Sequence, residues 1–171
     1  PYVSFRDAVE RERYDIQLLA KRFRAPMRSV MRRITTLHKT GQPGVPFFYL
    51  ELDALGNPVP FLPGADFYYP RTNLCARLLP TGENTCPIIT RSVSLQQSNG
   101  EVAEWFLMIH DERSAGITFE ERTKKRTLVL GTKQVNVNAL TYRDAALQNR
   151  TISIGLTCRL CEQQNCSDRT V

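Results

Sequence analysis

The sequence lacks the features of membrane, exported and disordered proteins. It contains no apolar run near the roughly 18 to 20 residues that a membrane-spanning helix needs, and its first residues lack the pattern of a signal peptide. Its 10 prolines and 9 glycines are scattered, and 42% of its 171 residues are hydrophobic, which is typical of a globular domain. We therefore expect a cytoplasmic protein that has no association with a membrane.

Motifs of the common enzyme classes are also missing. The two histidines, His38 and His110, belong to no H-E-x-x-H helix. A G-x-S-x-G elbow, a Walker loop and a dinucleotide-binding glycine motif are absent as well. We therefore expect that the chain is not an enzyme.

Positive charge is concentrated in the first part of the chain. Residues 1–40 hold 10 Lys and Arg against 4 Asp and Glu, whereas residues 41–171 hold 13 of each. Arginine outnumbers lysine 18 to 5, and its guanidinium is well suited to bidentate contacts with phosphate or carboxylate. An anionic partner is one explanation. Because the first residue is Pro1 rather than Met and helical patterning begins at once, we also expect a preceding segment of the protein.

The apolar residues between 14 and 38 have helical spacing and fall into two sets, which predicts two short amphipathic helices. Asp15 suits the start of the first helix, and Pro26 suits the start of the second. Gly41 is expected to end the second helix. A weaker helix is predicted over residues 5–11.

After residue 44 the apolar pattern becomes alternating or continuous, which is typical of strands. A hairpin is predicted from residues 45–52 and 59–61, with its turn at 55–57. The other predicted elements are strands over 66–69, 88–95, 101–109 and 126–137, a hairpin turn at 98–100 and a short helix or loop over 138–149.

These elements predict an α+β fold with N-terminal helices, a central, mostly antiparallel sheet and a metal-clamped C-terminal tail. We divide the chain into a helical segment over 1–43, an α+β domain over 44–149 and a cysteine-bearing tail over 150–171. The tail has too few apolar residues to form a core of its own.

The five cysteines include a compact group in the tail. Cys158, Cys161 and Cys166 form a C-x2-C-x4-C pattern, and such spacing lets neighbouring sulfurs converge on one metal. The fourth ligand is then Cys75 or Cys86. Spacing alone fits both zinc and an iron–sulfur cluster. A disulfide framework is disfavoured, because the number of cysteines is odd and the chain does not look exported.

Residues 15–39 carry seven Lys and Arg and one acidic residue. Two basic helices joined by a short turn are compatible with a helix-turn-helix that contacts DNA phosphates. Arg24, however, stands where such a turn usually has glycine, and a solvated basic face above an ordinary core is the alternative. Two other functions thus remain open, a zinc-stabilised DNA-binding module and a small iron–sulfur redox protein.

Aromatic residues recur through the strand region, several with arginine nearby. A sheet that turns them toward one concavity forms a ligand pocket, whereas the simpler interpretation places them in the core. The aromatic candidates for a pocket are Phe48, Tyr69 and Trp105.

Several segments are similar to the C-terminal region of the bacterial short-chain fatty acyl-CoA regulators, and the similarity extends over nearly the whole chain. Its most specific part is the tail, Ile154 to Glu162 with Cys166 and Arg169. The other segments that carry it are Pro1-Tyr2 with Phe5, and residues 14–23, 33–37 and 44–48.

The resemblance implies a transcription factor that senses short-chain acyl-CoA. Promoter DNA would be bound by an N-terminal helix-turn-helix domain outside this chain, as a homodimer in the full-length form. Residues 1–43 would end a peptidase-like region. In this family the tail cysteines, here Cys158, Cys161 and Cys166, hold a [4Fe–4S] cluster together with an upstream cysteine.

The resemblance favours Cys75 as that upstream ligand, because it follows Arg71 at the expected distance. Residues 76–78 depart from the family pattern, and Cys86 is kept as the alternative. The phosphates of acyl-CoA need cationic partners, for which Arg22, Arg28, Arg32 and Arg71 are the candidates.

Overall fold

Three short helices precede the sheet in the computed structural model of the protein, in the order that the apolar spacing predicts. They are α1 (Tyr2–Arg11), α2 (Ile16–Phe23) and α3 (Met27–Ile34). The structure describes residues 2–67, 75, 77, 87–96, 101–114, 124–155, 158, 161 and 163–169. Among these residues, no helix has the length and apolar character needed to cross a membrane.

Both ends of α2 are capped, by a side chain at its start and by a backbone N–H at its end. Asp15 caps α2 as predicted, and its carboxylate accepts a hydrogen bond from Leu18 N at 3.0 Å. α2 ends at Phe23 and is capped by Arg24, which has the left-handed conformation, with φ 48° and ψ 44°. α3 ends at Ile34 rather than near Gly41, so this boundary was predicted too late.

The early end of α3 has a local cause. The hydroxyl groups of Thr35 and Thr36 donate to the carbonyl oxygens of Arg32 and Arg33 at 2.7 and 2.8 Å. These bonds satisfy two carbonyl groups of the last helical turn. Without them, these carbonyls would need N–H donors from a further helical turn.

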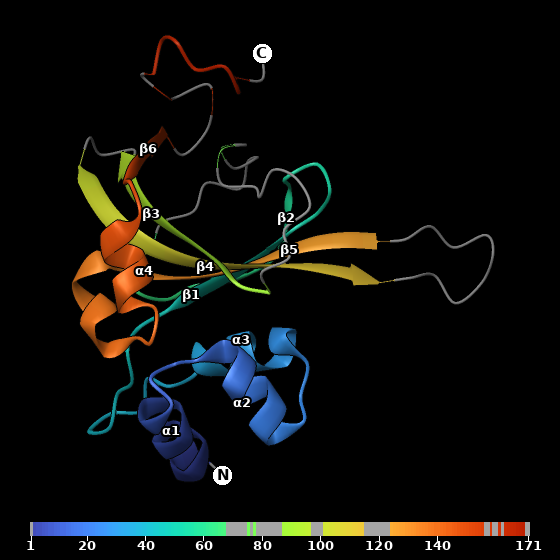
Figure 1. Ribbon diagram of the computed structural model, residues 1–171, viewed down its shortest axis with the longest axis vertical. Coiled ribbons are helices and arrows are strands. Elements are labelled where there is room, and N and C mark those ends of the chain that lie inside the picture. The colour runs from blue at the N-terminus through green and yellow to red at the C-terminus, as the bar shows by residue number, and fades with distance from the viewer. Residues whose placement is uncertain are drawn as a thin grey trace, which may run out of the picture.

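The sheet has six strands in the order β2-β1-β5-β4-β3-β6, and Figure 1 shows the three N-terminal helices on one side of it. All neighbouring strands are antiparallel except β3 and β6, which are parallel. The predicted α+β fold with a mostly antiparallel sheet is confirmed. The strands are β1 (Phe48–Leu52), β2 (Pro58–Leu62), β3 (Ile89–Gln96), β4 (Val102–Ser114), β5 (Lys124–Lys133) and β6 (Ile152–Gly155).

Both predicted hairpins are present. β1 and β2 are joined by a turn in which Asp53 accepts hydrogen bonds from Leu55 N at 2.9 Å and Asn57 N at 2.8 Å. β3 and β4 pair along their length, up to Gln96 opposite Val102. The turn predicted at 98–100 lies outside the described residues.

Two predicted strands are wrong in part. The strand expected over 126–137 ends at Lys133, and a 3-10 helix, η2 (Gln134–Ala139), follows. The Asn136 amide donates to Thr132 Oγ1 at 2.9 Å, a local side-chain bond of the kind that competes with strand pairing. In the strand expected over 66–69, Asp66 has a φ of 56° and lies in a turn. Residues 68 and 69 lie outside the described part.

The region after η2 contains a helix and a strand. α4 (Arg143–Gln148) is the helix allowed by the prediction over 138–149. β6 was not among the predicted strands, because residues 150–171 were assigned to a cysteine-bearing tail with too few apolar residues for a core of its own. Ile152 and Ile154 are the β-branched residues of this segment, and Ile154 is buried.

The two faces of the sheet have separate cores. One core joins the helices to residues of β1, β4 and β5, including Tyr49, Phe106 and Leu130. On the opposite face, alternate residues of the same strands, such as Phe48 and Leu107, form the second core. Every residue of β1 is buried, which explains why four of its five residues are aromatic or aliphatic and Glu51 is its one charged residue.

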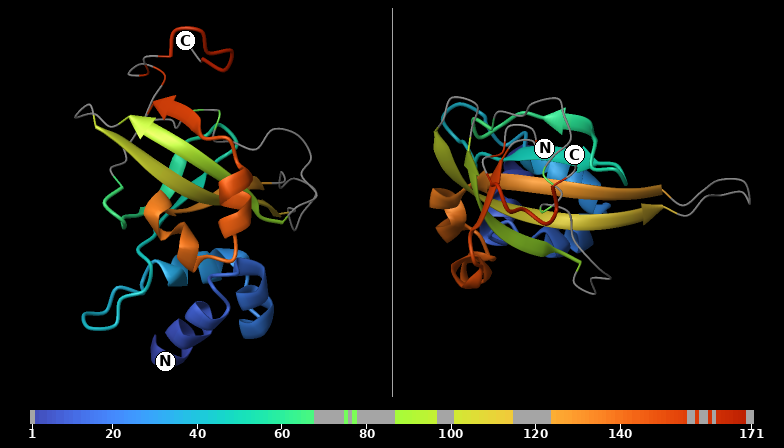
Figure 2. Two further views of the ribbon diagram at one scale, coloured as in Figure 1. Left: turned by 60° about the vertical axis from the view of Figure 1, so that its left-hand side comes forward. Right: turned by 90° about the horizontal axis from the view of Figure 1, so that it is seen from above.

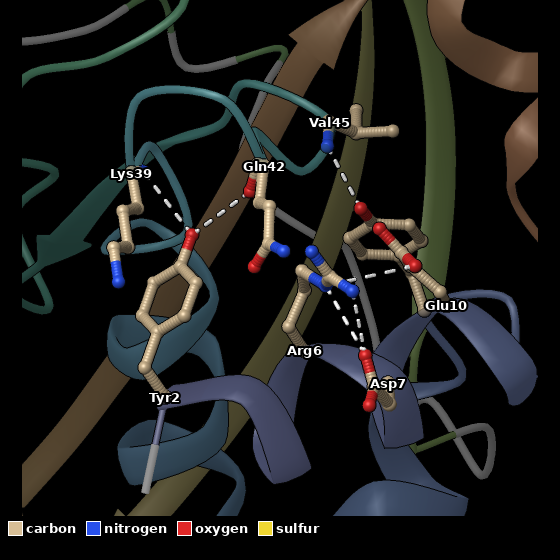
Figure 3. Close-up of polar contacts among 8 residues, drawn as sticks. Tyr2, Arg6, Asp7, Glu10, Lys39, Gln42 and Val45 are labelled. Atoms are coloured by element: carbon tan, nitrogen blue, oxygen red, sulfur yellow. Dashed lines mark hydrogen bonds and ion pairs between the residues drawn. The ribbon is translucent and has the colours of Figure 1, made fainter.

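The connector between α3 and β1 is bound to α1 (Figure 3). The Tyr2 hydroxyl donates to Gln42 O at 3.2 Å and accepts from Lys39 N at 3.1 Å. The Tyr14 hydroxyl accepts from Val45 N at 2.7 Å, and burial raises the pKa of Tyr14. These contacts fix the helices to the start of β1.

Candidate metal centre and ligand cavity

The cysteine tail follows β6 and lies at the end of the molecule opposite the N-terminal helices (Figures 1 and 2). Cys158, Cys161 and Cys166 are each partly exposed, whereas Cys75 is 7% exposed and belongs to the core on the sheet face opposite the helices. The structure records Cys75, Cys161 and Cys166 as free thiols.

The pKa of the Cys75 thiol is influenced by the tail cysteines. Burial raises the pKa of the Cys75 thiol, and the nearby thiols of Cys158, Cys166 and Cys161 raise it further. A hydrogen bond from the backbone of Arg77 opposes these effects. Cys75 therefore lies within electrostatic range of each of the three tail cysteines.

Backbone and ion-pair contacts hold the tail in this region. The Arg169 guanidinium donates from Nη2 to Cys161 O and Gln163 O, both at 2.9 Å. Arg77 Nε lies 3.9 Å from a carboxylate oxygen of Asp168. The first set of contacts closes the loop around Cys161, and the second joins the tail to the segment next to Cys75.

Cys161 also packs directly on β6. A Cβ placed on Gly155 would lie 2.6 Å from Cys161 Cβ and 2.9 Å from Cys161 Sγ. Only glycine leaves room for this side chain, because real Cβ atoms do not approach other atoms so closely.

The four cysteines suit a metal centre by their chemistry. Within the described part of the chain, no group of three or more His, Cys, Asp or Glu side chains is arranged to hold a metal ion. The donor set itself consists of soft thiols, which bind zinc or iron–sulfur clusters. Cys86, the alternative fourth ligand, lies outside the described residues.

An apolar cavity lies on the sheet face that Cys75 shares. The space inside it is about 20 Å³, enough for about one water molecule. A larger ligand must therefore displace a wall residue. The cavity is lined by Phe48, Leu50, Phe67, Val93, Leu95, Leu107, Val129 and Ile154.

Three aromatic side chains pack against one another beside the cavity. The rings of Phe48 and Phe67 are stacked with centroids 3.8 Å apart, and Trp105 meets Phe67 edge-on at 5.0 Å. The ring of Phe48 lies over Gly131, where an added Cβ would collide with it and would come within 2.9 Å of Leu107 Cδ2. Trp105 Nε1 is buried and has no hydrogen-bond partner among the described residues.

The predicted ligand-binding residues that the structure describes lie on opposite sides of the sheet. Phe48 lines the cavity and Trp105 packs beside it, so both belong to the core as well as to the cavity region. Tyr69 and Arg71 lie outside the described residues. Arg28 and Arg32 are on α3, on the opposite face of the sheet.

Arg28 is directed toward the sheet. Its guanidinium forms ion pairs with Glu51, at 3.6 Å, and with Glu112. Arg32, in contrast, is exposed. Because Glu51 and Glu112 belong to β1 and β4, the Arg28 contacts attach α3 to the sheet. This arrangement favours a structural role over a phosphate contact for Arg28.

A second, polar pocket lies where β6 meets the tail. Its volume is about 370 Å³, and its polar lining residues carry hydroxyl and amide groups. Ile154 lines this pocket as well as the apolar cavity. The lining consists of Ser94, Gln96, Val102, Ser153, Ile154, Gly155, Cys161 and Gln163.

Sequence reasoning missed most of the cavity wall. Ile154 and Gly155 were interpreted as part of a cysteine-bearing tail with too few apolar residues for a core of its own. Two patterns were usable signals for a buried second face. Val93 and Leu95 alternate with polar residues on β3, and residues 105–109 of β4 form a continuous apolar run. The position of β6 beside β3 had no such signal, because a parallel partner far along the chain leaves no local pattern.

Comparisons with known proteins agree with this fold. A solved structure described as a Mycobacterium tuberculosis transcriptional regulator matches with a TM-score of 0.79 at 24% identity, and the match covers 100% of this chain and 53% of that one. At this identity the match supports the fold alone.

Curated relatives match over nearly the whole chain. The propionyl-CoA carboxylase regulator of Cereibacter sphaeroides is 26% identical over 100% of the chain and 37% of its own length. The HTH-type transcriptional regulators PrpR and RamB of M. tuberculosis are 25% and 24% identical, each over 99% of the chain and 35% and 36% of their lengths. The chain thus spans about a third of these relatives.

A family profile described as "short-chain fatty acyl coenzyme A regulator, C-terminal" matches residues 36–171, which include the sheet, the cavity and the tail. The protein therefore belongs to the family of short-chain fatty acyl coenzyme A regulators and carries their C-terminal domain.

Proposed function

We propose that the chain is the sensor region of a cytoplasmic transcriptional regulator that binds short-chain acyl-CoA and an iron–sulfur cluster. The observation that carries this proposal is the juxtaposition of the buried Cys75, the three tail cysteines and an apolar cavity. The family description and the names of the relatives supply the class of effector.

Four cysteines of this chain would hold the cluster, namely Cys75, Cys158, Cys161 and Cys166. Cys75 is anchored in the core, while the other three come from a segment with no core of its own. Their shared ligation would fix the tail to the sheet. When bound, a [4Fe–4S] cluster supplies a thiolate-ligated centre that exchanges single electrons.

The apolar cavity is the proposed site of the acyl chain. Its lining is entirely hydrophobic, which suits a short hydrocarbon group but not the phosphates of coenzyme A. Trp105 Nε1, a buried donor without a described acceptor, is available to a ligand oxygen that reaches it. Arg71 is then the preferred cation for the phosphates, since Arg28 and Arg32 lie on the other face.

The rest of the proposal concerns the whole protein. Promoter DNA would be bound by an N-terminal domain outside this chain, and the full-length protein would act as a homodimer on two-fold operators. The relatives are named as regulators rather than enzymes. We accordingly assign this chain a regulatory and not a catalytic role.

Calorimetric titration with propionyl-CoA and with free coenzyme A tests the proposed effector. We expect propionyl-CoA to bind more tightly, because its acyl group buries apolar surface against the cavity wall once that wall has moved, whereas coenzyme A has no acyl group. A Leu107→Ala variant enlarges the cavity and should change the preference between propionyl-CoA and a longer acyl-CoA. The proposal is wrong if coenzyme A and propionyl-CoA bind equally or if neither binds.

A further inference from the structure

Arg91 of β3 lies among the apolar residues that border the cavity. Its neighbours on the same face of the strand, Ile89 and Val93, both pack in the core that contains the cavity. Arg91 is opposite Leu107 in the pairing of β3 with β4, and both Val93 and Leu107 line the cavity. A cation therefore lies beside a site whose lining is entirely hydrophobic.

The Arg91 side chain has a buried donor without an acceptor. Arg91 is half-buried, and its Nε is inaccessible to solvent. This atom has no hydrogen-bond partner in the part of the chain that the structure describes. An unpaired buried donor costs free energy, and few such donors occur in folded proteins. Arg91 Nε is therefore placed to donate to a ligand oxygen.

A second buried donor lies next to Arg91. Trp105 Nε1 also lacks a partner among the described residues. Because Trp105 is opposite Val93, it is the diagonal neighbour of Arg91 on the same face of the β3–β4 pair. Diagonal neighbours lie roughly 7 to 8 Å apart, within the reach of aromatic and long side chains. A single ligand group with two acceptor oxygens suits such a pair of donors.

Arg91 also lacks a countercharge, unlike two lysines on the same face of the sheet. Lys125 Nζ lies 3.1 Å from Asp111 Oδ2. Lys133 Nζ lies 3.1 Å from Asp66 Oδ2. No described carboxylate forms an ion pair with Arg91. One uncompensated positive charge beside an apolar cavity suits a ligand group that carries one negative charge.

These features favour a carboxylate over the phosphates of coenzyme A as the group that Arg91 binds. A carboxylate has one negative charge and two acceptor oxygens, so it neutralises Arg91 and accepts from both Arg91 Nε and Trp105 Nε1. A terminal phosphate carries about 1.5 to 2 negative charges, which one cation does not neutralise. Burial of the remaining charge against the apolar wall would be costly.

We propose that the effector of this chain is an acyl-CoA whose acyl group carries a carboxylate, bound by Arg91 and Trp105 at the edge of the apolar cavity. This inference rests on the proposed function and specifies the class of its effector. The hydrocarbon part of the acyl group would lie against Val93 and Leu107. Arg91 is then the residue that determines the preference for a carboxylated acyl group over an uncharged one.

The test is a calorimetric titration of the protein purified without oxygen, with propionyl-CoA and with two carboxylated probes. Both probes are propionyl-CoA with one added carboxylate, on the carbon next to the thioester in methylmalonyl-CoA and on the terminal carbon in succinyl-CoA. We expect at least one probe to bind about tenfold more tightly than propionyl-CoA, because its carboxylate accepts charged hydrogen bonds from buried donors.

Two matched variants test the role of Arg91. Arg91→Gln removes the positive charge and keeps a polar side chain. Arg113→Gln removes the same charge from an exposed position of β4. We expect Arg91→Gln to lose the preference for the carboxylated probe, and Arg113→Gln to keep it at the wild-type value. The comparison of the ligands on the wild-type protein does not depend on the folding of either variant.

The outcomes separate the two proposals. If propionyl-CoA binds and neither carboxylated probe binds more tightly, the inference is refuted and the acyl-CoA function stands. It is also refuted if Arg91→Gln and Arg113→Gln lose the preference equally. Free succinate that binds as tightly as succinyl-CoA would refute it too, since coenzyme A would then contribute nothing. If no acyl-CoA binds, the proposed function fails and the inference fails with it.

Discussion

Tyr49 donates its hydroxyl to Glu51 Oε1 at 2.7 Å, and both side chains are buried on the helix-facing side of β1. Burial raises the pKa of Tyr49, and the hydrogen bond to Glu51 raises it further. Glu51 also pairs with Arg28 of α3. A buried polar network thus joins the helices to the sheet within a largely apolar core.

Replacement of Glu51 should destabilise the domain. Glu51→Leu removes the acceptor of the Tyr49 hydroxyl and one of the carboxylates that pair with Arg28, so we expect a loss of about 3 kcal/mol in the free energy of unfolding. Tyr49→Phe removes a single hydrogen bond and should cost only about 1 kcal/mol. Urea denaturation measures both, and equal stability of Glu51→Leu and wild type would contradict this role.

Tyr142 predicts a dependence of stability on alkaline pH. Burial raises its pKa to about 12, while the unfolded value is 10.0. A raised folded pKa means that the unfolded state loses its proton first, so this contribution to stability is complete below pH 10 and is lost as the pH rises toward 12.

The Tyr142→Phe variant isolates this effect. It should be less stable than wild type at pH 9, because Ile16 N loses its hydrogen bond to the Tyr142 hydroxyl. The difference should shrink between pH 10 and pH 12, since phenylalanine cannot ionise. Parallel stability curves for the two proteins across this range would exclude the assignment.

Arg24 carries backbone strain that glycine would relieve. Its left-handed conformation ends α2 and disfavours any residue with a Cβ. We expect Arg24→Gly to raise the free energy of unfolding by about 0.5 to 1 kcal/mol, whereas Arg24→Ala, which removes the charge but keeps the Cβ, should have little effect. Thermal melts of both variants distinguish relief of strain from removal of charge.

The identity of the fourth cysteine ligand can be tested by paired substitutions. Cys75→Ser should abolish bound iron, because Cys75 interacts electrostatically with all three tail cysteines. Cys86→Ser should keep it. Iron and sulfide analysis after anaerobic purification gives the result, and retention of iron by Cys75→Ser together with its loss in Cys86→Ser would reverse the assignment.

Local patterns in the sequence predicted most of the elements but not all of their partners. The helical spacing of Ile16, Leu19, Val30 and Ile34 correctly identified the buried side of α2 and α3. The predictions failed where side chains near an element's end redirect the backbone, as at Thr35 and Asn136.

Prediction of the candidate site was limited by long-range contacts. The C-x2-C-x4-C pattern marked the tail cysteines without any structure, because its spacing is local. The contact of Gly155 with Cys161 and the inclusion of Ile154 in the cavity depend on the pairing of β6 with β3. Nothing near Ile154 in the sequence specifies that pairing.

The most direct test of the account is a visible absorption spectrum, with iron, sulfide and zinc analysis, of protein purified without oxygen. We predict a brown protein with broad absorption near about 400 nm and equal amounts of iron and sulfide, as for a thiolate-bound cluster. A colourless protein that holds one zinc ion, or no metal, would contradict the iron–sulfur assignment of Cys75, Cys158, Cys161 and Cys166.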